Sequence, residues 1–226
     1  MFFLKSKGAY KLIVAPVALM NLFFIASTTI TQVYAYNPAN VTTVYTESST
    51  QTNSLFNESI SQQLLKMNET AQQYRQKLLP YQGHKIPQHL LEEVQRTDNI
   101  HNEQLQDIIN QIGWPTPQKV GVKAASAAFL LAEKAPLALK KQLLPTFKEQ
   151  FKQGNLTGQQ LAVFTDKLLI KEGKKQQYGT QLAIVNKEVI FNNIEDEKHV
   201  DQRRAAMGMI SLSAYQALLE KMYHLK

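Results

Sequence analysis

Apolar residues recur at three- and four-residue steps through most of this chain, and that spacing predicts amphipathic helices. Five segments show it, each ended by a proline, a glycine or a polar run: residues 58–79, 87–112, 123–135, 137–153 and 158–172. Pro145 lies inside the fourth segment and should kink or split that helix, because proline removes a backbone donor and crowds the preceding turn. The fifth segment is apolar on nearly every side, which predicts a central, buried helix.

The pattern changes to that of strands after Gly173. Tyr178–Val185 and Glu188–Phe191 are rich in β-branched and aromatic side chains, and Asn186-Lys187 between them suits a two-residue turn. We therefore expect one β-hairpin at about residues 176–192.

Two short helices, over residues 198–207 and 213–223, complete the predicted elements. The predicted fold class is mainly α, with a single helical domain over residues 58–226 that carries one small β-hairpin. Residues 36–57 are rich in Thr, Ser and Asn and poor in large apolar side chains. Such a segment cannot bury enough surface to order itself, so we expect a flexible spacer there.

Residues 1–35 have the order of a secretory signal peptide. Three lysines precede an apolar run from Leu12 to Ala26, and the cleavage-like tripeptide Val33-Tyr34-Ala35 follows. About 20 apolar residues are needed to span a bilayer. Because Pro16 and Asn21 interrupt this run, a cleaved leader is favoured over the alternative, a retained N-terminal anchor. Either way we expect export to the periplasm or the extracellular space, with no membrane contact after signal cleavage.

Composition narrows the function classes. The leader holds three lysines and no acid, so its removal lowers the formal net charge from +7 to +4. The remaining positive charge is scattered, which argues against a nucleic-acid partner. The chain has no cysteine, so the core must supply its stability without disulfides. Its five histidines show no metal-ligand spacing, and no phosphate-binding or dinucleotide motif is present, so no metal or cofactor is expected.

Several short motifs follow one another in a fixed order. They are Asp98…Asn102, Gly113-Trp114-Pro115, Val120-Gly121, an alanine-rich segment, Thr165-Asp166-Lys167, Gln177-Tyr178-Gly179-Thr180-Gln181 and Val200-Asp201-x-Arg203-Arg204. Over about residues 92–219 this ordered set resembles a bacterial family known as domain of unknown function number 6624. The resemblance implies a shared fold and brings no reaction with it. Where the family pattern has Gln-His after the alanine-rich segment, this chain has Glu133-Lys134, so a base that such a histidine would supply is missing here.

Charged residues on apolar helix faces are the first candidates for a site. Asp98 and His101, with Asn102 beside them, lie on an apolar stripe of the second helix, and Asp166 lies in the most apolar helix. An unpaired buried carboxylate costs several kcal/mol. Each acid must therefore have a partner in a structural polar network, or line a ligand-binding or catalytic site. For Asp166 the natural partner is Arg203 or Arg204, and we expect a pair with Arg204, which shares an apolar helix face with Val200 and Met207.

Aromatic and amide side chains supply further candidates. Tyr178, Thr180 and Gln181 open the expected hairpin, with Thr180 and Gln181 on opposite faces of the sheet. They could form a polar recognition surface beside Trp114, the single tryptophan, which would serve as an aromatic platform. The structural alternative makes Tyr178 and Trp114 part of the core and leaves Gln181 to hold a helix end.

Three functional hypotheses remain. The favoured one is an exported, non-catalytic binding or interaction module of the cell envelope. It would hold an unknown polar ligand or envelope component in a cleft between the Gly-Trp-Pro corner, the hairpin and the acidic helices. The second is a hydrolase-type enzyme acting on an envelope substrate, with Asp98 or Asp166 as base and Gln181 or Arg204 steadying charge. The third is a purely structural envelope protein.

Overall fold

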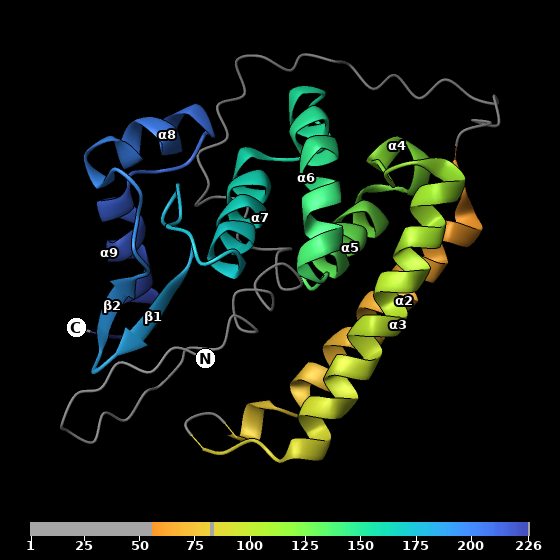
Figure 1. Ribbon diagram of the computed structural model, residues 1–226, viewed down its shortest axis with the longest axis horizontal. Helices are drawn as coiled ribbons and strands as arrows, with labels where there is room; N and C mark the ends of the chain where they lie inside the picture. Colours follow the sequence, from red (N-terminus) through yellow and green to blue (C-terminus); the bar gives the residue numbers. More distant parts are fainter. Residues whose placement is uncertain (1–55, 82–83, 226) are drawn as a thin grey trace.

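The computed structural model describes residues 56–81 and 84–225 (Figure 1). The expected leader and nearly all of the expected spacer lie outside these ranges. The elements are α2 (Glu58–Gln76), η2 (Leu79–Tyr81), α3 (Gln88–Ile112), α4 (Pro117–Val120), α5 (Val122–Ala132), α6 (Leu137–Lys152), α7 (Gly158–Lys171), β1 (Leu182–Val185), β2 (Glu188–Phe191), η3 (Glu197–His199), α8 (Val200–Ala206) and α9 (Leu212–Met222). The mainly α fold with one small hairpin is confirmed.

The two longest helices, α2 and α3, lie side by side and form an arm that projects from the rest of the molecule (Figure 1). The side chain of Asn57 caps α2 by accepting a hydrogen bond of 2.9 Å from the backbone N–H of Ile60. The last helical residue of α3 is Ile112, and Gly113 follows with a φ of +69°, a conformation that glycine adopts without strain. Within the described ranges, no helix combines the length and apolar character needed to cross a membrane.

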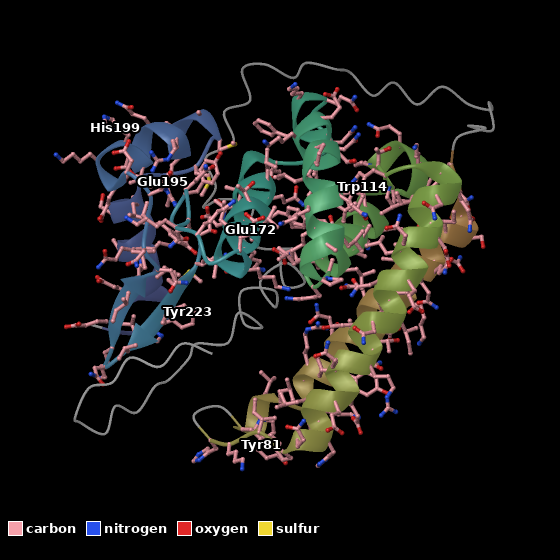
Figure 2. All side chains as sticks on the ribbon, viewed as in Figure 1. Tyr81, Trp114, Glu172, Glu195, His199 and Tyr223 are labelled. Atoms are coloured by element: carbon pink, nitrogen blue, oxygen red, sulfur yellow. The ribbon has the colours of Figure 1, made fainter. Side chains whose placement is uncertain are left out.

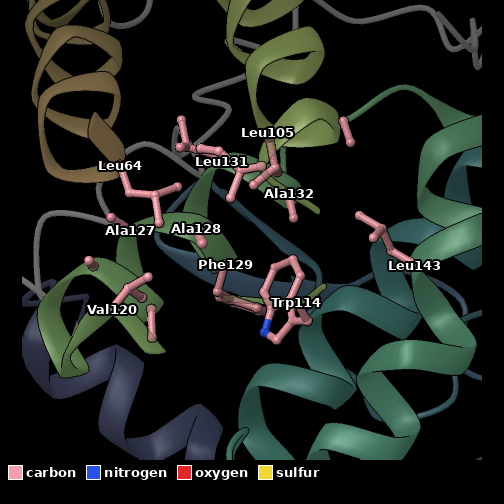
Figure 3. Close-up of a cluster of buried hydrophobic side chains, with 14 of the residues drawn as sticks. Leu64, Leu105, Trp114, Val120, Ala127, Ala128, Phe129, Leu131, Ala132 and Leu143 are labelled. Atoms are coloured by element: carbon pink, nitrogen blue, oxygen red, sulfur yellow. The ribbon is translucent and has the colours of Figure 1, made fainter. Parts of the chain in front are cut away.

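Small residues in α5 allow this helix to lie at the centre of the core. Ala124, Ala127, Ala128 and Ala132 are at most 1% exposed. Without bulky side chains on these faces, α5 packs closely against both α2 and α3 (Figure 3). The alanine-rich pattern in the sequence therefore marks the point at which the arm joins the body.

Aromatic rings fill the space between α5, α6 and α7. The ring of Phe147 lies 4.5 Å from that of Trp114, 5.7 Å from that of Phe129 and 4.4 Å from that of Phe164, measured between centroids. Such tilted and edge-to-face pairs are the favoured arrangements of aromatic side chains. Trp114 is 5% exposed, so it anchors the Gly-Trp-Pro turn in the core, as the structural alternative predicted, and it does not form an aromatic platform at the surface.

Of the two effects expected of Pro145, a kink or a split of its helix, the split is not found. The helix α6 continues from Leu137 to Lys152 through this residue. Proline at this position leaves the carbonyl of Lys141, one turn earlier, without its helical partner. Both Pro145 and Lys141 are exposed, so water can bind that carbonyl and the cost of the proline is reduced.

The hairpin begins later than the sequence suggested. The strands β1 and β2 pair in an antiparallel register that places Ile184 opposite Val189, and the turn residues Asn186 and Lys187 have φ values of 51° and 64°. The expected two-residue turn is thus confirmed. Residues 178–181, however, form a loop before β1, so Thr180 and Gln181 do not alternate across a sheet. The hairpin packs on α9.

Candidate functional site

The nine residues singled out by the sequence lie in three places rather than in one cleft. They are Asp98, His101 and Asn102 on α3, Trp114 in the core, and Asp166, Tyr178, Thr180, Gln181 and Arg204 around the segment that follows α7. Between described residues, no hydrogen bond or ion pair joins the α3 group to the last group. Figure 2 shows Trp114 and Glu195, a residue of the last group's surroundings, on opposite sides of α6 and α7.

Asp166 organises the loop that follows α7. Its side chain is fully buried and accepts hydrogen bonds from the backbone N–H groups of Gln177 at 2.7 Å, Tyr178 at 3.1 Å and Thr180 at 3.0 Å. The hydroxyl of Thr180 donates a further bond at 2.9 Å. Burial raises the pKa of Asp166, while the bonds from the loop act in the opposite direction. The Asp166 carboxylate thus accepts the hydrogen bonds of loop N–H groups that have no backbone carbonyl to bind.

A buried glutamine holds the same loop from its other side, and we call it, with Asp166 and residues 177–181, the Asp166 cluster. The Gln176 side chain donates to the carbonyls of Gln181 at 2.9 Å and Asn192 at 2.6 Å. Its oxygen accepts from the backbone N–H of Gln181 at 2.9 Å. Sequence analysis missed Gln176, because nothing in the local pattern distinguishes it from the exposed glutamines of this chain.

Two arginines of α8 complete the attachment of the loop. Arg204, 1% exposed, donates to the carbonyls of Tyr178 and Ile210, both at 2.6 Å, and Arg203 donates to the carbonyl of Gln177 at 2.8 Å. The expected direct pair of Asp166 with Arg204 is therefore wrong. The acid binds the N–H groups of the loop and the arginine binds its carbonyls, so the two are linked through the backbone.

Gly179 shows how closely the loop packs. Its φ is +66°, and a Cβ placed on it would lie 2.7 Å from Cδ1 of Leu212 and 3.0 Å from Cδ1 of Ile194. The glycine is therefore needed for backbone conformation and for close approach. The Tyr-Gly-Thr-Gln motif is a sealed structural element in which every polar group named above has a partner.

A second group of polar side chains lies where α2, α3, the end of α5 and α7 meet. We call these side chains, together with a lysine from α6, the charged junction: Arg75, Asp98, Glu133, Lys134, Lys167 and, from α6, Lys140. One nitrogen of Arg75 donates to both carboxylate oxygens of Asp98, at 2.6 and 2.7 Å, and another donates to the carbonyl of Ala71 at 3.0 Å. Lys167 pairs with Glu133 at 2.9 Å. Both acids of the junction therefore have a cation bound to them.

Two lysines of the junction have no acid bound to them. Lys134 is half-buried, and its side chain makes no hydrogen bond or ion pair with a described residue. Its pKa is lowered to about 8, by burial and then by the charge of Lys167. Lys140 is fully buried, and burial lowers its pKa to about 7. Its Nζ lies 3.4 Å from the carbonyl oxygen of Ala132 and 4.4 Å from the centre of the Phe164 ring. The junction therefore carries an excess of positive charge.

His101 lies next to the junction on α3. It is 7% exposed, and its Nδ1 is buried with no hydrogen-bond partner. Burial lowers the pKa of His101, an effect that Asp98 opposes and Arg75 reinforces, so the ring is neutral at pH 7. Asn102, also on α3, is half-buried. Within the described ranges, no group of three or more His, Asp or Glu side chains could hold a metal ion.

Two hollows of the described surface differ in their chemistry. One of about 400 Å³ runs along α3 between Gln88 and Asn99, but its lining residues all belong to that helix and are all exposed. Another of about 400 Å³ lies between α2 and α3 and is lined in part by His101. Only the second contains a buried polar group, so it is the one relevant to binding.

Two cations of the charged junction that sequence analysis missed, Arg75 and Lys140, could have been found by the rule that identified Asp98. Arg75 continues the apolar stripe of α2 four residues after Ala71. Lys140 precedes the buried Leu143 by three residues and Phe147 by seven, so it too lies on an apolar stripe. A cation on an apolar helix face is as unusual as an acid there, and it too must have a counterion or a hydrogen-bond partner.

The sequence model of a protein family described as a family of unknown function (DUF6624) matches residues 58–226. That range includes both the charged junction and the Asp166 cluster. No curated protein and no solved structure shows significant similarity to the chain.

Proposed function

The chain belongs to the family of unknown function DUF6624, and we propose that it is an exported, non-catalytic binding module of the cell envelope. In this proposal the charged junction binds an anionic group, a carboxylate or a phosphate, of a polar ligand. The observation that carries the proposal is Lys134, a half-buried cation without an acid bound to it, at the meeting point of four helices.

The charges of the junction support an anion as the missing component. Asp98 and Glu133 are each bound to one cation, Arg75 and Lys167, and this leaves Lys134 and Lys140 without a counterion. A desolvated ammonium group without a counterion is unfavourable, which is why burial lowers the pKa of both lysines. An anion bound at Lys134 would supply the opposite charge and would raise the pKa of its ammonium group.

The rigidity of the surroundings also supports a binding role. Arg75 is held by Asp98 and by the carbonyl of Ala71, and Lys167 is held by Glu133. Arg75 and Asp98 come from α2 and α3, which both pack on the alanine-rich α5. A site whose charged groups are already fixed loses less entropy on binding, which favours affinity.

The hydrolase alternative finds little support in the geometry. Both oxygens of Asp98 are bound to Arg75, and the carboxylate of Asp166 accepts from four donor groups in a sealed loop. Arg204 binds two backbone carbonyls. Neither acid is therefore free to take a proton from water, and the arginine proposed to steady charge is already occupied.

Thermal denaturation of the purified protein with inorganic phosphate or acetate, at pH 7 and constant ionic strength, tests the binding proposal. An anion that binds the folded protein raises the midpoint by mass action. We expect phosphate to raise it in the wild type and in Lys134→Arg, but not in Lys134→Met. Lys123→Met, which changes an exposed lysine of α5, the helix that ends just before Lys134, is the matched control and should keep the shift. A full shift in Lys134→Met, or no shift in the wild type, would contradict the proposal.

Export is tested separately, because it rests on the charge and apolar order of residues 1–35 alone. Cell fractionation followed by mass spectrometry of the N-terminus should find the protein outside the cytoplasm and beginning at Tyr36. Protein that keeps Met1 and remains in the cytoplasm would refute this part of the proposal without affecting the anion site.

A further inference from the structure

We infer that the groove between α2 and α3 is a second binding site, distinct from the charged junction, and that it takes an uncharged, hydroxyl-rich ligand such as a saccharide unit. Its volume of about 400 Å³ lies within the range of small-molecule sites. Six of its lining residues carry the argument: Gln63, Met67 and Tyr74 from α2, and Ile100, His101 and Gln104 from α3.

The imidazole of His101 is the buried polar group of this groove. Among the described residues, its Nδ1 is the one buried side-chain nitrogen or oxygen atom that has no hydrogen-bond partner. Native proteins pair such atoms almost without exception, so an orphan in the wall of a hollow points to a group that binds there. A neutral imidazole offers one donor and one acceptor, and a hydroxyl group can serve either. A hydroxyl-bearing ligand can therefore bind the ring in either tautomer. A rotation of the ring about χ2 would turn Nδ1 toward the groove.

Two side-chain amides add free hydrogen-bonding capacity. The side-chain amides of Gln63 and Gln104 make no hydrogen bond with a described residue, although both line the groove. The two threonines of the lining differ, because Thr70 donates to the carbonyl of Lys66 and Thr97 to that of Glu93, each at 2.9 Å. The amides, with the imidazole, are thus the groups left to bind the hydroxyls of a ligand.

Apolar side chains supply the rest of the surface. Tyr74 and Met67 line the α2 side, and Ile100 lines the α3 side with 48% of its surface exposed. A saccharide ring has hydroxyls at its edge and C–H groups on its faces, so it can use both the amides and these apolar groups. The one charged residue of the lining, Lys66, is paired with Glu69 at 3.2 Å. The groove therefore has no unmatched charge, which favours an uncharged ligand and separates this site from the junction.

The test is a titration of the isotopically labelled protein with glucose and with N-acetylglucosamine, observed through the imidazole nitrogens of His101 by NMR. Cyclohexane-1,2-diol serves as a probe with few hydroxyls. We expect the His101 nitrogens to shift with the saccharides and much less with the diol. Gln63→Leu and Gln104→Leu should each weaken binding about tenfold, as expected for the loss of a hydrogen bond to an uncharged group.

Two variants separate this site from the junction and from failure to fold. His101→Phe should abolish saccharide binding while unfolding at the same temperature as the wild type or higher, because it removes an unpaired polar atom. Lys134→Met, which tests the anion site, should bind saccharides normally. The inference is overturned if neither saccharide shifts the His101 nitrogens, or if saccharides bind equally well to His101→Phe and both glutamine variants.

Discussion

Replacing Asp166 by asparagine tests whether the Asp166 cluster is a structural element. In the wild type, three backbone N–H groups and one hydroxyl donate to this fully buried carboxylate. Asparagine keeps one oxygen and replaces the other by an NH₂ group. That group would face the N–H of Thr180 or those of Gln177 and Tyr178, depending on the orientation of the amide. Donors would then point at donors, and at least two bonds would be lost.

The magnitude follows from the kind of bond that is lost. A hydrogen bond to a charged group contributes about 1.5–3 kcal/mol, and an unpaired buried donor costs about 1–3 kcal/mol. Because the lost bonds share one acceptor, they do not add fully, and some water can enter. We expect Asp166→Asn to lower the free energy of unfolding by about 3–5 kcal/mol, comparable to breaking a buried ion pair. Thr180→Val removes the hydroxyl that donates to Asp166 and accepts from the Gln181 side chain, and it should cost about 1–2 kcal/mol.

Urea denaturation followed by circular dichroism measures these changes. Asp107→Asn is the matched control, because Asp107 is exposed, and it should lie within about 0.5 kcal/mol of the wild type. The interpretation of the cluster would be refuted if Asp166→Asn were as stable as that control. A catalytic acid that is not needed for folding would give that result.

The remaining predictions concern packing and charge. Gly179→Ala should lower the free energy of unfolding by about 1–3 kcal/mol in the same denaturation assay. The new Cβ would overlap Leu212, and alanine does not favour a φ of +66°. Unchanged stability would contradict the close packing of the loop. Arg204→Lys should fail to restore the stability lost in Arg204→Ala, since one ammonium group cannot replace two guanidinium nitrogens bound to Tyr178 and Ile210; full restoration would argue against that geometry. The free energy of unfolding should rise between about pH 7 and pH 9.5. The pKa of Lys140 is about 7 in the folded state and 10.5 in the unfolded chain, so in this pH range the folded protein holds fewer protons on Lys140 than the unfolded chain does. Lys140→Met should remove the rise between about pH 7 and pH 8 in urea midpoints measured at several pH values, and should leave above pH 8 the part that Lys134, with its pKa of about 8, contributes. An equal rise in this variant would mean that another group is responsible.

The helices could be predicted from sequence because their evidence is local. Periodicity marked α2, α3 and α7 within a few residues of their observed ends. Residues 178–181 were assigned to a strand because their side chains suit one. In the structure they form a loop, because a carboxylate from the preceding helix binds their N–H groups. That contact involves residues up to 14 positions apart, and no local pattern contains it.

The same distinction applies to the candidate site. An acid on an apolar stripe showed correctly that Asp98 and Asp166 need partners. The position of an acid does not reveal which group binds it. Arg75 lies 23 residues before Asp98, and the groups that bind Asp166 belong to the backbone. The single cleft expected from the sequence is instead two separate polar clusters. One is closed by its own hydrogen bonds, and the other is left with an excess of positive charge.

The titration of the Lys134 side chain tests the binding proposal most directly. NMR of the labelled lysine amines, assigned with Lys134→Arg, measures this pKa in the absence and presence of inorganic phosphate. Without phosphate we expect a value of about 8, below the 10.5 of an ordinary lysine, and with phosphate a higher value. A Lys134 that titrates near 10.5 and does not respond to phosphate would show that the junction has neither the buried charge nor the anion site proposed for it.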